Sequence, residues 1–544
     1  MKSNPLIVAL AQSNFILGDL TGNCNKIIDD ARAAFENGAR LLVTPELSMT
    51  GYPPEDLLFR DAFIQAVNEH VELLCKELAQ FKDMFVIVGH PSRAVNQSQV
   101  CLHNCASVIS NGVVIANYAK QFLPNSEVFD EVRYFSPGNQ TCVFEAHGTQ
   151  IGLIICEDIW HQGPAQAAKS AGAELLIIPN ASPFHMEKTY LRKDILKKQI
   201  LDIKIPAIYV NLVGGQDELV FDGASFAMNS EGKLVDEAPQ FVEQLRFLEF
   251  IDGDILSGNI TAAKSTEQQV YDALVLGVKD YLGKNGFPGA IIGLSGGVDS
   301  ALVLAIAVDA LGADRVRAVM MPSRYTADIS WIDAKDMADR LGVQYDEIPI
   351  APMFDAFESS LAKDFAGLTP NATEENIQAR IRGTLLMALS NKSGRIVLTT
   401  GNKSEMAVGY CTLYGDMAGG FAVIKDVVKT LVYRLCDYRN SISPVIPERI
   451  ITRAPSAELR PDQKDQDSLP SYEVLDAILE NYMENDVPIE TLLTSGFSMA
   501  DVDKVTRLIK INEYKRRQSP IGVRITRRAF GRDWRYPITS KFRA

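Results

Sequence analysis

Ser295-Gly296-Gly297-Val298-Asp299-Ser300 lies between the apolar run Ala290–Leu294 and the apolar stretch Ala301–Val308. This order predicts a β-strand, a tight loop and the start of an α-helix. The glycines let backbone N–H groups approach an anion, the helix start adds partial positive charge, and the hydroxyls of Ser295 and Ser300 are further donors. The segment therefore predicts a binding site for a nucleotide's pyrophosphate.

Asp299 would repel phosphate unless a divalent cation lies between them, which points to Mg²⁺. The loop lacks G-x-x-x-x-G-K-[ST], which argues against transfer of a γ-phosphate. The alternative interpretation is an ordinary glycine turn between a strand and a helix. The motif S-G-G-x-D-S resembles that of the ATP pyrophosphatases, which cleave ATP between its α and β phosphates to adenylate a substrate. That resemblance implies ATP as a substrate.

The second half of the chain repeats strand and helix patterns. The predicted strands are Ile291–Leu294, Val316–Met320, Gln344–Ile348 and Ile396–Thr400. Such alternation predicts a Rossmann-like, doubly wound parallel sheet, in which ligands bind at the carboxyl ends of the strands.

The first half alternates short β-rich runs with helical patterns at Asn23–Asn37, Asp61–Gln80 and Lys188–Asp202, which suggests a layered α/β domain. The predicted strands are Leu6–Leu10, Leu41–Thr44, Phe85–Gly89, Cys105–Ile109, Ile151–Cys156, Leu175–Pro179 and Ala207–Asn211. From Phe241 to Ser265 the pattern loosens, and Glu267–Leu282 begins a new helix. We therefore expect two domains, residues 1–258 and 259–544.

Composition narrows the possible partners. The net charge of −14 disfavours nucleic acid and anionic membranes, so a phosphate site must be built locally. No run approaches the roughly 18 apolar residues of a membrane span. The eight cysteines are scattered and no export signal precedes them, so we expect reduced thiols and a cytoplasmic protein.

Glu46, Lys120 and Cys156 each stand at the end of a predicted strand or in the loop beside it. Singly, they are explained as a solvated acid, a surface amine and a buried small side chain. Together and in this order they resemble the Glu-Lys-Cys triad of the carbon–nitrogen hydrolase (nitrilase) superfamily. That resemblance covers the first half and implies an α-β-β-α sandwich that cleaves amides.

In that chemistry the Cys156 thiolate attacks an amide carbon, Glu46 moves the proton, and Lys120 stabilises the negative charge. The resemblance extends to the glutaminase branch of the superfamily, where Glu157 and Ser182 would hold the α-amino and carboxylate groups of glutamine. Ser182 is nearly as well explained as a turn residue. Glu131 either orients the triad or is a surface acid.

The second half resembles the NAD synthetase family across residues 267–544, and the whole chain resembles its glutamine-dependent members. The segments that carry the resemblance are Thr399–Glu405, Asn376–Gly383, Tyr414–Phe421 and Lys429-Thr430. By that resemblance Thr400 joins residues 295–300 at ATP, and Glu405 is the second Mg²⁺ ligand opposite Asp299. Deamido-NAD⁺ would be bound by Asn376, Arg380, Asp416, Lys429 and Lys515. Ammonia-dependent members carry a histidine near Lys515, so in this chain that contact passes to Tyr514 or Lys515, or is absent.

Three alternatives remain at this point. Other glutamine-fed ligases use glutaminases that need Cys at position 2 or a Gly-x-Cys-x-Gly elbow, and neither is present. A binding protein with two inactive enzyme-like domains would not need the reactive residues of both halves. An ammonia-only synthetase with a decayed amidase is the third. The resemblance also implies a homo-oligomer.

Overall fold

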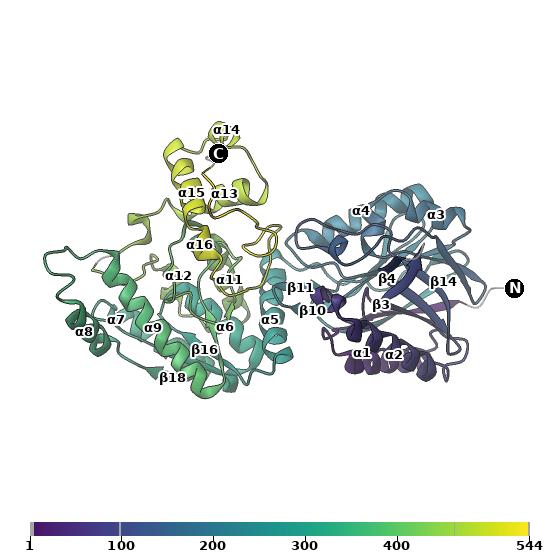
Figure 1. Ribbon diagram of the computed structural model, residues 1–544, viewed down its shortest axis with the longest axis horizontal. Helices are drawn as coiled ribbons and strands as arrows, with labels where there is room; N and C mark the ends of the chain where they lie inside the picture. The colour runs from purple at the N-terminus through teal and green to yellow at the C-terminus, as the bar shows by residue number, and fades with distance from the viewer. Residues whose placement is uncertain (1–4, 97–98, 462, 542–544) are drawn as a thin grey trace. The chain divides into compact units, whose positions relative to one another are not determined.

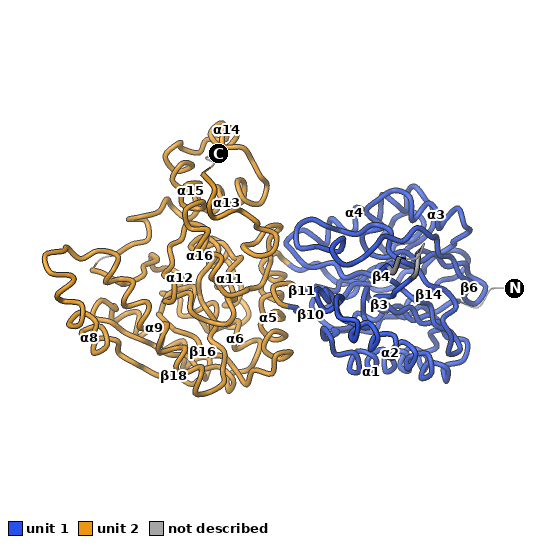
Figure 2. Tube along the Cα trace, viewed as in Figure 1, with its two compact units in different colours: residues 1–216, 220–264 blue, residues 217–219, 265–544 orange. Residues whose placement is uncertain are grey.

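The chain forms two compact units in the computed structural model, which describes residues 5–96, 99–461 and 463–541. Unit 1 comprises residues 1–216 and 220–264, and unit 2 comprises residues 217–219 and 265–544; Figure 2 shows them in blue and orange. Within the described residues, no helix combines the length and apolar character needed to cross a membrane. All eight cysteines are free thiols.

Unit 1 is built on two large sheets. The first has the strand order β15-β14-β1-β2-β3-β4-β5 and the second β13-β12-β9-β8-β7-β6, with β10 and β11 as a separate pair. The strands are β1 (Leu6–Gln12), β2 (Leu41–Val43), β3 (Phe85–Asn96), β4 (Gln99–Ser110), β5 (Val113–Ala119), β6 (Cys142–Ala146), β7 (Thr149–Leu153), β8 (Leu175–Asn180), β9 (Ala207–Asn211), β10 (Val213–Gln216), β11 (Leu219–Asp222), β12 (Phe226–Met228), β13 (Leu234–Glu237), β14 (Gln244–Ile251) and β15 (Asp254–Ile255).

Helices cover the outer faces of this pair of sheets. Figure 1 shows α1 (Leu20–Glu36) and α2 (Asp61–Leu78) along one face and α3 (Pro164–Ser170) and α4 (Lys188–Ile203) along the other. The Asp19 side chain caps α1 by accepting a hydrogen bond from the Gly22 N–H at 2.9 Å. The unit is therefore the predicted four-layer α-β-β-α sandwich.

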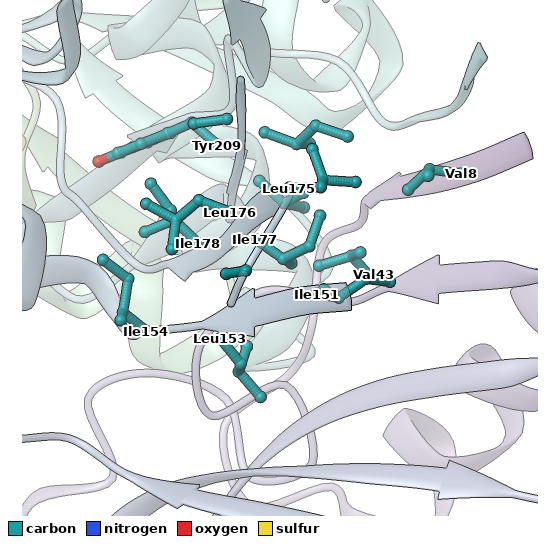
Figure 3. Packing of buried hydrophobic residues seen from close by; sticks show 14 of the residues in the cluster. Val8, Val43, Ile151, Leu153, Ile154, Leu175, Leu176, Ile177, Ile178 and Tyr209 are labelled. Carbon is teal, nitrogen blue, oxygen red and sulfur yellow. The ribbon is translucent and has the colours of Figure 1, made fainter. Parts of the chain in front are cut away.

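The core of unit 1 lies between its two sheets. Figure 3 shows Val8 and Val43 of the first sheet beside Ile151, Leu153 and residues 175–178 of the second. All six residues of β8 are buried, so the strand reads as one continuous apolar run rather than an alternating pattern. This buried layer holds the strand ends from which the reactive residues project.

Two secondary-structure predictions in unit 1 are wrong in part. The strand predicted over Ile151–Cys156 stops at Leu153, and a 3₁₀ turn, η3 (Cys156–Trp160), begins at Cys156. The loose segment predicted from Phe241 contains β14, which pairs antiparallel with all of β1. Only Leu248 and Phe250 of β14 are buried, and the alternate face carries Leu245, Phe247 and Ile251 beside Glu249, so the strand shows no clean alternation of apolar and polar residues.

Unit 2 contains the predicted parallel sheet, in the order β18-β17-β16-β19-β20, with every pairing parallel. Its elements are α5 (Thr266–Lys284), β16 (Ala290–Gly293), α6 (Val298–Leu311), β17 (Val316–Met320), α7 (Asp328–Leu341), β18 (Gln344–Glu347), α8 (Ala351–Leu361), α9 (Ala372–Ser393), β19 (Ile396–Thr399), α10 (Lys403–Val408), β20 (Phe421–Ala422), α11 (Lys429–Ile442), α12 (Glu448–Thr452), α13 (Tyr472–Leu479), α14 (Ile489–Thr494), α15 (Met499–Ile511) and α16 (Glu513–Arg516).

The direction in which the chain adds strands across this sheet reverses at β16: the chain moves outward through β17 to β18 and then returns to add β19 on the other side of β16. Right-handed crossovers place α6 and α7 on one face and α8 and α9 on the other. The loops that follow β16 and β19 therefore meet at the carboxyl edge of the sheet, where open α/β sheets bind ligands. A smaller apolar cluster joins α10 to α13, α14 and α15, and these last three helices lie together in Figure 1.

Candidate active sites

Lys120 occupies the centre of a buried charge cluster in unit 1. It follows β5, and its Nζ donates hydrogen bonds to Glu46 Oε1 at 2.6 Å and to Glu131 Oε1 at 2.8 Å. The side chains of Lys120 and Glu46 are fully buried. Burial alone would lower the pKa of Lys120, but the charges of Glu131 and Glu46 raise it well above its ordinary value. The lysine is therefore a permanent cation in this site.

Both carboxylates are fixed by further donors. Glu46 accepts from Asn104 Nδ2 at 2.8 Å and from the Ala181 N–H at 3.0 Å. Glu131 accepts from the Tyr52 hydroxyl at 2.8 Å, and it is buried. Glu131 is thus no surface acid: it is buried and, like Glu46, accepts a hydrogen bond from Lys120.

Cys156 lies on a strained turn. Its φ of +45° is in the left-handed region, which a non-glycine side chain occupies at a cost of about 1–3 kcal/mol. Burial raises the pKa of the Cys156 thiol well above its ordinary value, and the charge of Glu46 raises it further, while the charge of Lys120 lowers it. Burial and Glu46 therefore disfavour the thiolate, and a nearby base is needed to make the sulfur a nucleophile.

The two residues predicted to hold glutamine occupy different surroundings. Ser182 is buried, and its Oγ accepts from Arg192 Nε at 3.0 Å. Burial would lower the pKa of Arg192, but the charge of Asp222 raises it above its ordinary value. Glu157 is partly exposed and lies 3.1 Å from His161 Nε2. Ser182 therefore belongs to the buried part of the site and Glu157 to its exposed edge.

The predicted phosphate loop of unit 2 has the geometry of an anion site. The Gly297 N–H donates to Ser295 Oγ at 3.2 Å, and Ser295 Oγ lies 3.0 Å from Ser300 Oγ. Gly296 has a φ of +78°, and a Cβ there would lie 2.2 Å from the carbonyl oxygen of Ser330. Helix α6 begins directly after Gly297, so its N-terminus faces the loop.

Acidic and basic side chains meet beside this loop. Asp299 accepts from Asn402 Nδ2 at 2.9 Å and forms an ion pair with Lys429, whose Nζ also lies 3.4 Å from Glu405 Oε1. Burial raises the pKa of Glu405 to about 8; Lys429 lowers it and Asp299 raises it. Among the described residues no three metal-binding side chains converge on one point. A cation here would therefore depend on two carboxylates, with phosphate oxygens and water as its other ligands, which suits Mg²⁺.

One cleft contains all six residues of the phosphate loop together with Thr400, Glu405, Asp416 and Lys429. Lys429, which the sequence grouped with deamido-NAD⁺, contacts Asp299 and Glu405 in this cleft. Thr400 follows β19 and reaches the cleft from the neighbouring strand end.

The other four residues predicted for deamido-NAD⁺ gather around one loop, residues 409–416. Asn376 Oδ1 accepts from Thr412 Oγ1 at 2.7 Å, and Arg380 Nε donates to the Leu413 carbonyl at 3.3 Å. Asp416 Oδ1 accepts from the Thr412 N–H at 2.7 Å, and Lys515 Nζ donates to the Gly409 carbonyl at 2.8 Å and to the Cys411 carbonyl at 2.9 Å. Burial raises the pKa of Asp416 to about 6. Of these four, only Asp416 lines the clefts beside the phosphate loop, and it shares one of them with Lys429.

Several residues at the two sites were missed by sequence reasoning. Asn104 and Tyr52 hold the carboxylates of unit 1, and Asn402 holds Asp299 in unit 2. Arg382 lines the clefts beside Ser295; burial lowers the pKa of its guanidinium to about 10. Of these, Arg382 and Asn402 stand inside the quoted motifs, which was the only available signal.

Comparison with known proteins places both sites in a known context. Residues 7–263 match the family model for carbon–nitrogen hydrolase, and residues 270–519 match that for NAD synthase. The chain is 47% identical to a glutamine-dependent NAD(+) synthetase from Acinetobacter baylyi, with 98% of each chain covered. It is 43% identical to the protein of that name from Aquifex aeolicus, covering 99% of this chain and 100% of that one. Among solved structures, it resembles a glutamine-dependent NAD+ synthetase from Acinetobacter baumannii in complex with ADP, with 45% identity, a TM-score of 0.80 and 98% of each chain covered.

Proposed function

This chain belongs to the family of glutamine-dependent NAD(+) synthetases, and on that basis we infer that it makes NAD⁺ from deamido-NAD⁺, ATP and glutamine. The products are NAD⁺, AMP, pyrophosphate and glutamate, and the reaction is the last step of NAD biosynthesis. One observation supports this most strongly: a single chain carries a buried Glu-Lys-Glu cluster with a cysteine in unit 1, and a phosphate loop with paired carboxylates in unit 2.

In unit 1, we assign the nucleophile to Cys156. Its sulfur attacks the side-chain carbonyl carbon of glutamine while Glu46 accepts the thiol proton. Lys120 stabilises the charge that develops on the carbonyl oxygen, and Glu46 returns the proton to the departing ammonia. Water then hydrolyses the thioester to glutamate. The raised pKa of Cys156 is consistent with a proton that leaves only when Glu46 accepts it.

Ser182 and Glu157 are our candidates for binding glutamine itself. Because Ser182 Oγ already accepts from Arg192, its own hydroxyl proton is directed elsewhere and is available to an anionic group. Glu157 offers a carboxylate at the exposed edge of the site, suited to an α-ammonium group.

In unit 2, we assign ATP to residues 295–300 and Thr400. The nicotinate carboxylate of deamido-NAD⁺ attacks the α-phosphorus, and pyrophosphate leaves toward the loop. Ammonia then attacks the acyl carbon and AMP departs. Lys429 lies where it would contact the phosphates, so we move it from the deamido-NAD⁺ group to the ATP group. Asn376, Arg380, Asp416 and Lys515 remain our candidates for deamido-NAD⁺.

Asp299 and Glu405 would hold Mg²⁺, whose charge offsets that of the phosphates. The oxygen-only donor set fits this ion. A bound cation would also favour the carboxylate form of Glu405, whose pKa burial raises to about 8, and would release its proton to solvent. We also propose a homo-oligomer in the cytoplasm; the eight free thiols are consistent with a reducing compartment.

The test is a product balance. The protein is incubated with ATP, deamido-NAD⁺, glutamine and Mg²⁺, and NAD⁺, AMP, pyrophosphate and glutamate are quantified. We expect one AMP and one pyrophosphate for each NAD⁺. Release of ADP and phosphate instead, or no NAD⁺, would refute the assignment.

A further inference from the structure

Asp158 is a buried carboxylate that the chemistry above does not use. It lies on η3, two residues after Cys156, and its exposed fraction is zero. A carboxylate removed from water in this way is costly unless it is fully hydrogen-bonded. Burial is accordingly the main influence that raises the pKa of Asp158, and the hydrogen bonds that it accepts lower it.

Its four donors come from two separate segments. Oδ1 accepts from the backbone N–H groups of Gln121, at 3.0 Å, and Phe122, at 2.8 Å. Oδ2 accepts from the Ile155 N–H at 3.0 Å and from the Tyr118 hydroxyl at 2.8 Å. The first segment, residues 118–122, carries Lys120 at its middle, and the second, residues 155–158, carries Cys156.

The turn that carries Cys156 needs such support. The Asp158 N–H closes the turn by donating to the Ile155 carbonyl at 3.0 Å, while the side chain of the same residue accepts from the Ile155 N–H. These bonds hold Cys156 at its φ of +45°, which the cysteine would otherwise leave. The same carboxylate holds the backbone directly after Lys120, at Gln121 and Phe122, and the side chain of Tyr118 before it.

We propose that Asp158 is a positioning residue that ties the lysine-bearing segment to the cysteine-bearing turn and thereby sets the placement of the Lys120 ammonium relative to the Cys156 sulfur. This inference rests on the proposed glutaminase function. The proposed role differs from a purely structural one, because loss of the hydrogen bonds that Asp158 accepts should change the chemistry at Cys156 and not only the stability of unit 1.

The experiment compares three variants of the full-length protein. Asp158→Asn keeps the shape of the side chain but replaces one acceptor oxygen of the carboxylate with an amide NH₂ group, a donor that faces other donors. Tyr118→Phe removes a single donor and leaves the backbone bonds. The matched control is Asp236→Asn: Asp236 is equally buried in unit 1 and accepts from Arg246 Nε at 2.8 Å and the Asn259 N–H at 2.8 Å, but neither contact involves residues 118–122 or 155–158.

For Asp158→Asn we expect kcat for glutamine hydrolysis to fall on the order of 100-fold with little change in KM, since a small misplacement of reacting groups has that effect. Ammonium-driven synthesis should be unchanged. Alkylation of Cys156 by iodoacetamide should shift to higher pH, because the charge of Lys120 lowers the pKa of that thiol and the variant displaces it. Asp236→Asn should lower the melting temperature without shifting either kcat or the alkylation profile.

If Asp158→Asn and Asp236→Asn have the same kcat for glutamine hydrolysis and the same pH profile of Cys156 alkylation, the proposal is overturned. If Asp158→Asn does not fold, Tyr118→Phe decides: we expect a fall in kcat of several-fold with the same direction of alkylation shift, and a wild-type profile overturns the proposal. The alkylation readout needs no turnover, so failure of the wild-type protein to hydrolyse glutamine would refute the proposed function and leave this inference separately testable.

Discussion

Replacing Lys120 with methionine removes the only cation that contacts Glu46 and Glu131 through the hydrogen bonds described above, and leaves both carboxylates buried. Breaking a buried ion pair by removing one partner typically costs about 3–5 kcal/mol, because the remaining charge is uncompensated. The hydrogen bonds from Asn104 and Tyr52 persist and reduce this cost. For Lys120→Met we therefore expect unit 1 to lose about 3 kcal/mol of stability at pH 7.

The loss of stability caused by Lys120→Met should depend on pH. Burial, and next to it the charge of Glu46, raise the pKa of Glu131 in the native protein, while the charge of Lys120 lowers it. Without Lys120 the pKa of Glu131 rises further above its unfolded value of about 4.3. A group with a raised native pKa contributes stability that is fully present below its unfolded pKa and is lost as pH rises through the native pKa. The destabilisation by Lys120→Met should therefore grow from pH 5 to pH 8.

Native-state hydrogen exchange of peptides from β8, measured against urea concentration, reports the stability of unit 1 separately from unit 2. Ammonium-driven synthesis controls for the integrity of unit 2. The matched variant is Lys26→Met, which removes a partly exposed ion pair with Glu243 and should change stability by less than about 1 kcal/mol. A loss for Lys120→Met no larger than that of Lys26→Met, or one that shrinks as pH rises, would show that the buried cluster is not ionised as described.

Three further predictions concern single residues. Asp299→Asn should abolish NAD⁺ synthesis from either glutamine or ammonium while glutamine hydrolysis persists, measured as glutamate release; unimpaired synthesis would remove Asp299 from the site. Gly296→Ala should abolish ATP binding by calorimetry, because its Cβ would meet the Ser330 carbonyl at 2.2 Å, whereas Gly286→Ala, with a similar φ of +72° but open space around it, should bind ATP normally. The rate of Cys156 alkylation by iodoacetamide, followed by mass spectrometry, should still be rising at pH 9, because burial and Glu46 raise the pKa of the thiol; a plateau below pH 8 would contradict that environment.

The sequence predicted those features that depend on neighbours along the chain. The strand-loop-helix order at residues 290–308 follows from local composition, and the parallel sheet follows from the alternation of strands and helices. Glu46, Lys120 and Cys156 each stand beside a strand end, and their order along the chain, which resembles that of the Glu-Lys-Cys triad, indicates their role. The structure brings Glu46 and Lys120 into direct contact although 74 residues separate them in the chain.

The remaining contacts arise from tertiary packing and leave no local pattern. Asn104 lies within β4, where nothing in the sequence distinguishes it from any other polar residue of a strand. Lys429 reaches Asp299 across 130 residues, so its neighbours in the chain did not reveal its place at the phosphate loop. The apolar run before Cys156 gave no sign of the turn, because that conformation is held by Asp158 rather than by intrinsic preference.

The division of work between two sites is tested most directly by Cys156→Ala, with NAD⁺ formation measured from glutamine and, separately, from high ammonium. Because Cys156 is the proposed nucleophile of unit 1 and the adenylating residues all lie in unit 2, we expect synthesis from glutamine to vanish and synthesis from ammonium to remain at the wild-type rate. Parallel loss of both activities, or persistence of glutamine-driven synthesis, would contradict the account.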